Sequence, residues 1–463
     1  MMLKIEPNPD LGINDKPMPI SKKPKVDPNR ILKQGIWAYF LLLIFEGALR
    51  KWFLQGLATP LLIIRDPIAI WLVLKCWQRD LLPSSIYLIG MVIIGVISIF
   101  TAVFLGHGNL FVALFGARIL LFHFPLIFVI GKIFTREDVI NIGKATLLIT
   151  IPMTILIAMQ FYSPQSAWVN RGVGGDMAGA GYSGAMGFFR PPATFSFTTG
   201  TSSYYGFAAC FIFYFWFDLK RVNKLILIAA TLAMFAAVPL SISRTVLFQI
   251  GVTAIFTVLA VSRKPQYIGK LLIAVVGGIT ILAILAQTSF FNQATEAFTS
   301  RFTDANGIEG GLKGTLGDRF LGGLVSALSE SANQPYFGYG TGMGTNVGSM
   351  LLSGNRKFLI SEGEWGRELG EMGPLLGLFV IFLRIGLTVK IILASYRKLA
   401  VNDFLPWLLL SFGLLELAQG NWAQPTYLGF SIMISGLMLA SLNSNNVKKR
   451  VIPNKKNLNE AFA

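Results

Sequence analysis

Five arginines lie inside or at the edges of long apolar stretches of this sequence: Arg65, Arg118, Arg190, Arg244 and Arg319. Charged residues within membrane-spanning helices are rare and are functional candidates by default. A guanidinium keeps its charge at every physiological pH and binds the oxygens of a phosphate in pairs. For each arginine taken singly, contact with lipid phosphates is the favoured explanation. We expect the five arginines to converge just below the outer membrane surface and to form a site for a phosphorylated ligand.

Hydroxyl groups surround one of these arginines. Ser241 and Ser243 precede Arg244 at the expected start of a helix, where hydroxyls and free backbone N–H groups suit an anion. Arg118 has no acidic residue within four positions in its own apolar stretch. Its partner must therefore come from another helix, from water or from an anionic ligand.

Two carboxylates are the candidates for acid–base chemistry. Glu362 and Glu364 form a carboxylate-x-carboxylate pair, and one of them near an arginine cluster could deprotonate a hydroxyl nucleophile. The alternative is a solvated helix start, where acidic residues favour the helix dipole. We expect a helix over 358–371, with Arg367 and Glu371 paired on its surface.

Metal and nucleotide chemistry find little support in the sequence. Two histidines lie far apart, and no Asp-x-Asp occurs in the outer segments, so no metal site is predicted. No Walker A loop or dinucleotide-binding fingerprint occurs, so no cofactor is predicted. The arginines would then supply the electrostatic stabilisation that a metal ion gives elsewhere.

The elements that must position these residues are membrane-spanning helices. Of the 463 residues, 53% are hydrophobic and 14% are charged, whereas soluble domains carry about 25% charged residues. Apolar runs reach the roughly 20 residues that a spanning helix needs. We predict an all-α polytopic membrane protein with about twelve spans: 34–54, 57–75, 83–104, 109–131, 145–162, 200–217, 225–240, 245–262, 271–288, 373–394, 404–418 and 426–441.

These spans define one transmembrane domain, 34–441, between two cytoplasmic tails, 1–33 and 442–463. Lys and Arg concentrate on the side that holds both termini, which is typical of the cytoplasmic side. The net charge of +17 is therefore explained by topology and contact with membrane lipid, and a nucleic-acid partner is not favoured.

Two long segments lie on the outer side, 163–199 and 289–372. Unstructured loops of such length are uncommon and are often functional. We expect the second segment to form short helices, one of them over 318–330, and a tight glycine turn that contains Gly338, Gly340, Gly342 and Gly344.

The order of several motifs resembles the bacterial O-antigen ligase/O-antigen polymerase superfamily, which comprises membrane glycosyltransferases of the C-type architecture. The resemblance covers about residues 185–390. Its motifs are Arg190-Pro191, the Ser-x-Ser-Arg run that ends at Arg244, Arg319 before Pro335, Gly338 and Gly340, and Glu371 with Gly373 and Gly377. Ligases of the superfamily usually place a His-Asn pair shortly before the last glutamate. Here Glu362 occupies that place and the loop has no histidine, which favours a polymerase.

The resemblance implies a metal-independent glycosyltransferase of the bacterial cytoplasmic (inner) membrane that makes O-antigen or exopolysaccharide. It would polymerise glycan units from an undecaprenyl (polyprenyl) diphosphate-linked oligosaccharide, using a glycan acceptor and other polysaccharide-assembly proteins as partners. A ligase with a lipid acceptor and a lipid-linked-glycan flippase or transporter are the alternatives. The expected catalytic residues are Arg244, Arg319, Glu362 and Glu364, and the expected donor- or glycan-binding residues are Arg65, Arg118, Arg190, Ser241, Ser243, Trp365 and Arg367.

Overall fold

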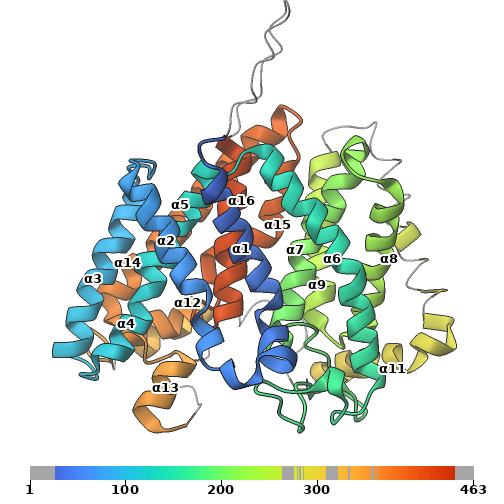
Figure 1. Cartoon of the computed structure of the whole chain (residues 1–463), viewed down its shortest axis with the longest axis horizontal. Helices are drawn as coiled ribbons and strands as arrows, with labels where there is room; N and C mark the ends of the chain where they lie inside the picture. Colours follow the sequence, from blue (N-terminus) through green and yellow to red (C-terminus); the bar gives the residue numbers. More distant parts are fainter. Residues whose placement is uncertain are drawn as a thin grey trace, which may run out of the picture.

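The computed structural model describes residues 27–262, 286–308, 322–331, 334–355, 359–361 and 363–443, with isolated positions from 269 to 284. This part of the chain is a helical bundle (Figure 1). A two-residue hairpin, β1 (Tyr182–Ser183) with β2 (Phe189–Arg190), is its β structure. The helices are α1 (Arg30–Ala48), α2 (Arg65–Gln78), α3 (Ile86–Phe104), α4 (Leu110–Arg118), α5 (Phe124–Ile133), α6 (Arg136–Tyr162), α7 (Thr198–Phe217), α8 (Lys224–Leu240), α9 (Arg244–Val261), α11 (Ser289–Ile308), α12 (Gly322–Ser331), α13 (Asn346–Ser353), α14 (Glu364–Ala400), α15 (Leu405–Gln419) and α16 (Pro425–Asn443).

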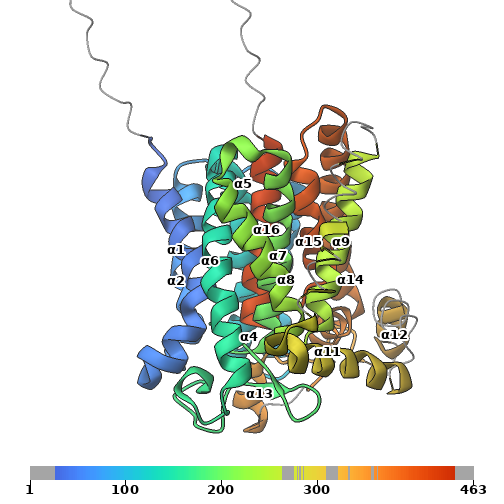
Figure 2. The same ribbon diagram turned by 90° about the vertical axis from the view of Figure 1, so that its right-hand side faces the viewer.

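The two ends of the bundle differ. The start of α1 and the end of α16 lie at one end (Figure 2). At the opposite end, which we call the loop end, α11 runs across the bundle and α13 lies below it. The described part of the second long segment therefore forms helices, as expected. Which side of a membrane each end faces stays a prediction.

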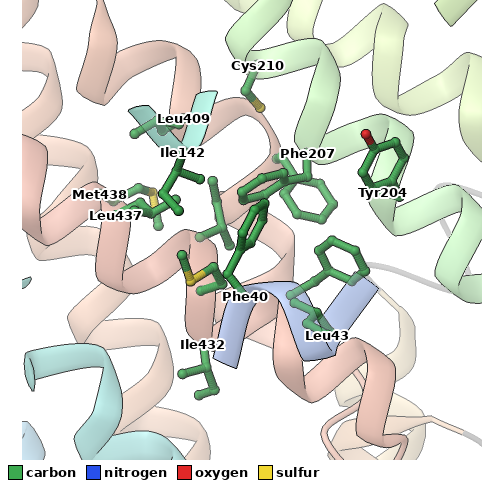
Figure 3. Close-up of a cluster of buried hydrophobic side chains, with 14 of the residues drawn as sticks. Phe40, Leu43, Ile142, Tyr204, Phe207, Cys210, Leu409, Ile432, Leu437 and Met438 are labelled. Carbon is green, nitrogen blue, oxygen red and sulfur yellow. The ribbon is translucent and has the colours of Figure 1, made fainter. Parts of the chain in front are cut away.

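Aromatic and aliphatic side chains fill the centre of the bundle. Phe40 of α1, Phe207 of α7 and Met438 of α16 are fully buried and lie together (Figure 3). Apolar contacts between these helices therefore fill the centre from which the loop end extends.

Seven helical segments are long and apolar enough to cross a membrane: Arg30–Phe53, Ile86–Phe104, Leu110–Ile133, Arg136–Tyr162, Arg244–Val261, Glu364–Ala400 and Pro425–Asn443. The shorter α8 and α15 are also apolar. The described part of the chain therefore fits a multi-pass all-α membrane protein, but the predicted count of twelve spans is not met.

The expected span 57–75 explains part of this difference. The chain forms short 3-10 turns at Gln55–Leu57 and Pro60–Ile63, and α2 begins only at Arg65. A helix of 14 residues is about 21 Å long, whereas the apolar core of a bilayer is about 30 Å thick. Half of the expected span 271–288 lies outside the described residues.

Local breaks occur where the sequence has special residues. Gly373 has φ 74° and ψ 172°, a conformation that glycine adopts readily, and Pro374 follows it. This break separates a short helix over 364–372 from the long span. The expected helix over 358–371 is confirmed only from Glu364 onward, because 359–361 are not helical. Gly338, Gly340 and Gly342 all have positive φ, which confirms the predicted glycine turn.

Two π-helical turns interrupt the spans. One covers Leu49–Phe53, directly after α1, and the other covers Ile119–His123, between α4 and α5. Such turns occur frequently at functional sites. Each lies beside buried basic residues, Arg50 and Lys51 in the first case and Arg118 in the second.

Candidate functional site

Arg190 of β2 is the best candidate for a ligand-binding arginine at the loop end. Its guanidinium lies 4.7 Å from the ring centroid of Tyr182, its partner in the hairpin. Its Nε is buried and has no hydrogen-bond partner within the described residues. Burial lowers the pKa of Arg190, and the positive charges of Arg301 and Arg244 lower it further. The side chain therefore lies among like charges.

These three basic residues, Arg190, Arg244 and Arg301, are called the arginine cluster below. They come from three separate elements, β2, α9 and α11. The structure thus brings together two of the arginines that the sequence nominated and adds Arg301, which it did not. Several guanidiniums at one place favour an anion with more than one negative charge.

A strained turn sets the position of Arg244. Ile242 has φ 47°, a left-handed conformation that is costly for a β-branched residue. Ser243 is the residue before α9, but its hydroxyl lies 3.0 Å from the Ser202 hydroxyl and does not cap the helix. Ser241 Oγ donates to the Val238 carbonyl at 3.2 Å. The start of α9 at Arg244 is confirmed, whereas both serine hydroxyls are engaged within the protein.

An open apolar groove of about 560 Å³ lies between α6, α8 and α11. Its lining residues are Thr154, Ile155, Ala158, Met159, Tyr162, Ser163, Ala236, Leu240, Phe290 and Phe291. Leu240 is the last residue of α8, shortly before Arg244, and α11 carries both phenylalanines and Arg301. The apolar groove and the arginine cluster therefore both involve α11 and the end of α8 with the start of α9.

Arg65 and Arg118 belong to a different group of residues, which we call the paired network. Arg65 Nε donates to Glu46 Oε2 at 3.1 Å, and Arg118 Nη1 donates to Asp66 Oδ1 at 2.8 Å. His123 Nε2 lies 2.9 Å from the same Asp66 oxygen. Of the three partners left open for Arg118, the structure has a residue of another helix, Asp66 of α2. The expected convergence of all the arginines in one pocket is not what the structure has, because Arg65 and Arg118 have their own carboxylates.

A third group lies at the break in α14. Both oxygens of Glu364 accept hydrogen bonds from Arg367, at 2.8 and 2.9 Å, and Arg384 Nη1 donates to Glu364 at 2.8 Å. Arg367 Nη1 also donates to Glu371 Oε2 at 2.6 Å. Arg367 and Glu371 are buried, so the prediction of a pair on the helix surface is wrong. The pairing itself is correct, but α14 packs inward at this point.

This third group holds the glycine turn in place. Glu371 Oε1 accepts from the Gly344 N–H at 2.8 Å, and the Glu371 carbonyl accepts from the Gly340 N–H at 2.9 Å. Trp365 is half-buried and donates from Nε1 to the Ala418 carbonyl at 3.3 Å. These contacts give Glu364, Trp365 and Arg367 structural partners.

Arg319 and Glu362 lie outside the described residues, so their roles stay predictions. Arg301 was not predicted, because the motifs that stand out in the segment 289–372 lie after residue 317. The signal for Arg301 was present: phenylalanines at 291, 298 and 302 recur at helical spacing, which indicates an amphipathic helix with a basic residue on it.

The bundle and its apolar segments fit the class of multi-pass all-α membrane proteins. No family model matches the chain, and no curated protein or solved structure matches it significantly. The resemblance to the O-antigen ligase and polymerase superfamily stays a prediction from sequence motifs.

Proposed function

We propose that this chain is a membrane glycosyltransferase that polymerises glycan units from a polyprenyl-diphosphate-linked donor at the outer face of the bacterial cytoplasmic membrane. The observation that carries the proposal is that α11 carries Arg301 of the arginine cluster and also lines an open apolar groove, whose lining includes Leu240, shortly before Arg244 in the chain. A diphosphate that carries a long hydrocarbon chain has both the negative charge that suits the arginines and the apolar part that suits the groove. The groove would hold the part of the chain nearest the diphosphate.

The proposed reaction is a displacement at the anomeric carbon. The acceptor hydroxyl oxygen forms a bond to that carbon, and the bond from carbon to the diphosphate oxygen breaks. The electron pair leaves with the diphosphate, whose developing charge Arg244 stabilises, with Arg319 as the second catalytic arginine that the sequence nominates. Arg190 and Arg301 would bind the diphosphate before and after the reaction.

The hydroxyl proton passes to a carboxylate. Glu364 already accepts from two arginines, Arg367 and Arg384, which disfavours it as the base. Glu362 is therefore the stronger of the two carboxylates nominated by the sequence, and a polymerase or a ligase would use it in the same way.

The test is reconstitution of the whole chain in liposomes with a polyprenyl-diphosphate oligosaccharide, with product length followed by gel electrophoresis. We expect Arg244→Ala to abolish elongation, and Lys132→Met, which changes an exposed lysine near the other end of the bundle, to elongate normally. A folded Arg244→Ala protein with full activity would disprove the proposal. Product that stays on polyprenyl diphosphate indicates a polymerase, and product on another lipid indicates a ligase.

A lipid-linked-glycan transporter is the second candidate. The buried charges of the paired network, beside the π-helical turn Ile119–His123, favour it, because interrupted helices with polar groups are typical of transporters. Liposomes that contain a fluorescent lipid-linked glycan and no acceptor separate the two functions. Movement of the glycan between leaflets without elongation would support the transporter.

A further inference from the structure

Lys51 is a buried cation that the proposed chemistry does not use. It is fully buried, and none of the described acidic residues forms an ion pair with it. Its Nζ donates to the Ala193 carbonyl at 2.5 Å and lies 4.6 Å from the ring centroid of Trp52. Buried charges normally have a charged partner, so a lysine aimed at a single backbone carbonyl calls for an explanation.

The backbone that Lys51 holds is strained. Ala193 is fully buried and has φ 53°, a left-handed conformation that is unusual for alanine. Gln160 of α6 binds the same residue from another direction. Its Oε1 accepts from the Ala193 N–H at 2.8 Å, and its Nε2 donates to the Ala193 carbonyl at 3.2 Å. Strained backbone persists where the surroundings fix it from several sides, as Lys51 and Gln160 do here.

The same end of α1 also forms hydrogen bonds with Thr194 and Ser196, which follow Ala193. Thr194 Oγ1 donates to the Ile44 carbonyl at 2.7 Å, and Arg50 Nη1 donates to Ser196 Oγ at 2.9 Å. A Cβ on Gly47 would lie 2.4 Å from the Thr194 carbonyl oxygen, so only glycine permits this approach. The chain from Ala193 to Ser196 is therefore fixed against the end of α1 and the π-helical turn that follows it, and Arg190 lies three residues before this stretch.

We infer that Lys51 is a positioning residue: together with Gln160 it holds the Ala193 turn, and this turn fixes Arg190 within the arginine cluster. The inference rests on the proposed function only in its last step, where Arg190 binds the donor diphosphate. The mechanical step, from Lys51 to the hairpin, is independent of any reaction.

A spin label on the exposed Ser183→Cys in β1 tests the mechanical step. The native cysteines are both buried, and the chain without Ser183→Cys serves as the labelling control. We expect Lys51→Met to increase the mobile fraction of the spectrum at least threefold and Lys132→Met to leave it unchanged. Gln160→Met should act in the same direction, and the double variant should add little. Unchanged spectra in folded Lys51→Met and Gln160→Met proteins would overturn the inference.

The functional step is read from the kinetics of the reconstituted protein. We expect Lys51→Met to raise the KM for the lipid-linked donor about tenfold and to change kcat less than threefold, because Arg190 contributes to binding before the reaction. A mobile hairpin with an unchanged KM would overturn the positioning role. If the wild-type protein transfers no glycan, the proposed function fails, and the spectra alone still decide whether Lys51 holds the turn.

Discussion

The paired network and the arginine cluster differ in the charges that surround their arginines. In the paired network, Arg65 and Arg118 are buried and each contacts a carboxylate, Glu46 or Asp66. In the arginine cluster, Arg190 has no ion pair within the described residues, and the nearest charges that act on it are positive. Arginines of the first kind need no ligand to be stable, whereas Arg190 lies where an added anion would relieve repulsion. The presence of a local carboxylate therefore separates Arg65 and Arg118 from Arg190.

The largest expected effect comes from removing one partner within the paired network. Asp66→Leu leaves Arg118 and His123 buried without the carboxylate, which we expect to lower the free energy of unfolding by about 3–5 kcal/mol. Unfolding in a denaturing detergent measures the change. The double variant Asp66→Leu with Arg118→Met should recover most of the loss, and no change in the single variant would contradict the structural role.

The second prediction concerns binding. Arg190→Met should change the free energy of unfolding by no more than about 1 kcal/mol, because the partly buried Arg190 has no ion pair within the described residues and lies among like charges. Loss of charge-assisted hydrogen bonds should weaken the donor roughly 10- to 100-fold. The KM for donor and a thermal melt measure the two quantities. A strong loss of stability with normal KM would place Arg190 with the structural arginines.

The third prediction concerns the groove. Ala158→Trp places a large ring among the groove residues of α6 and α8, so a donor with a long polyprenyl chain should bind less well. We expect the KM for a full-length donor to rise severalfold, and the KM for a donor with a short, soluble lipid to change little. Ile97→Trp, which is exposed on α3, is the matched control. An equal rise in KM for both donors would show that the groove does not bind the polyprenyl chain.

The smallest expected effect is that of salt. Inorganic pyrophosphate should bind less tightly to the arginine cluster as ionic strength rises, because partly exposed charges are screened. The stability difference caused by Asp66→Leu should respond less, because a buried pair is screened less. Calorimetry measures the pyrophosphate affinity, and detergent unfolding measures the stability change, each at two salt concentrations. Identical salt responses would contradict the difference in burial between the arginine cluster and the paired network.

The sequence predicted the parts of the fold that depend on local chemistry. The all-α class, the start of α9 at Arg244, the helix before Gly373 and the glycine turn all follow from apolar length, helix-start residues and glycine. The number of spans was not predictable in the same way, because the 3-10 turns before α2 are not marked by polar residues. Tertiary packing decides them.

The candidate site was predictable only in part. Arg190 and Arg244 stand out as arginines at the edges of apolar stretches, and the sequence nominated both. The sequence did not show which carboxylates pair with Arg65 and Arg118, because Glu46 and Asp66 come close to them only when α1, α2 and α4 pack together. Sequence spacing showed that Arg367 and Glu371 pair, but not that they are buried.

The π-helical turn Leu49–Phe53 has a consequence for the evolution of this chain. Neighbouring residues on a regular helix point about 100° apart, yet Ala48, Arg50 and Lys51 are all buried. The wider turn carries one more residue than a regular one, and that residue lets two successive cations face inward. Deleting a single residue here would restore regular winding without rotating the flanking segments, and only one of the two basic side chains would then face inward.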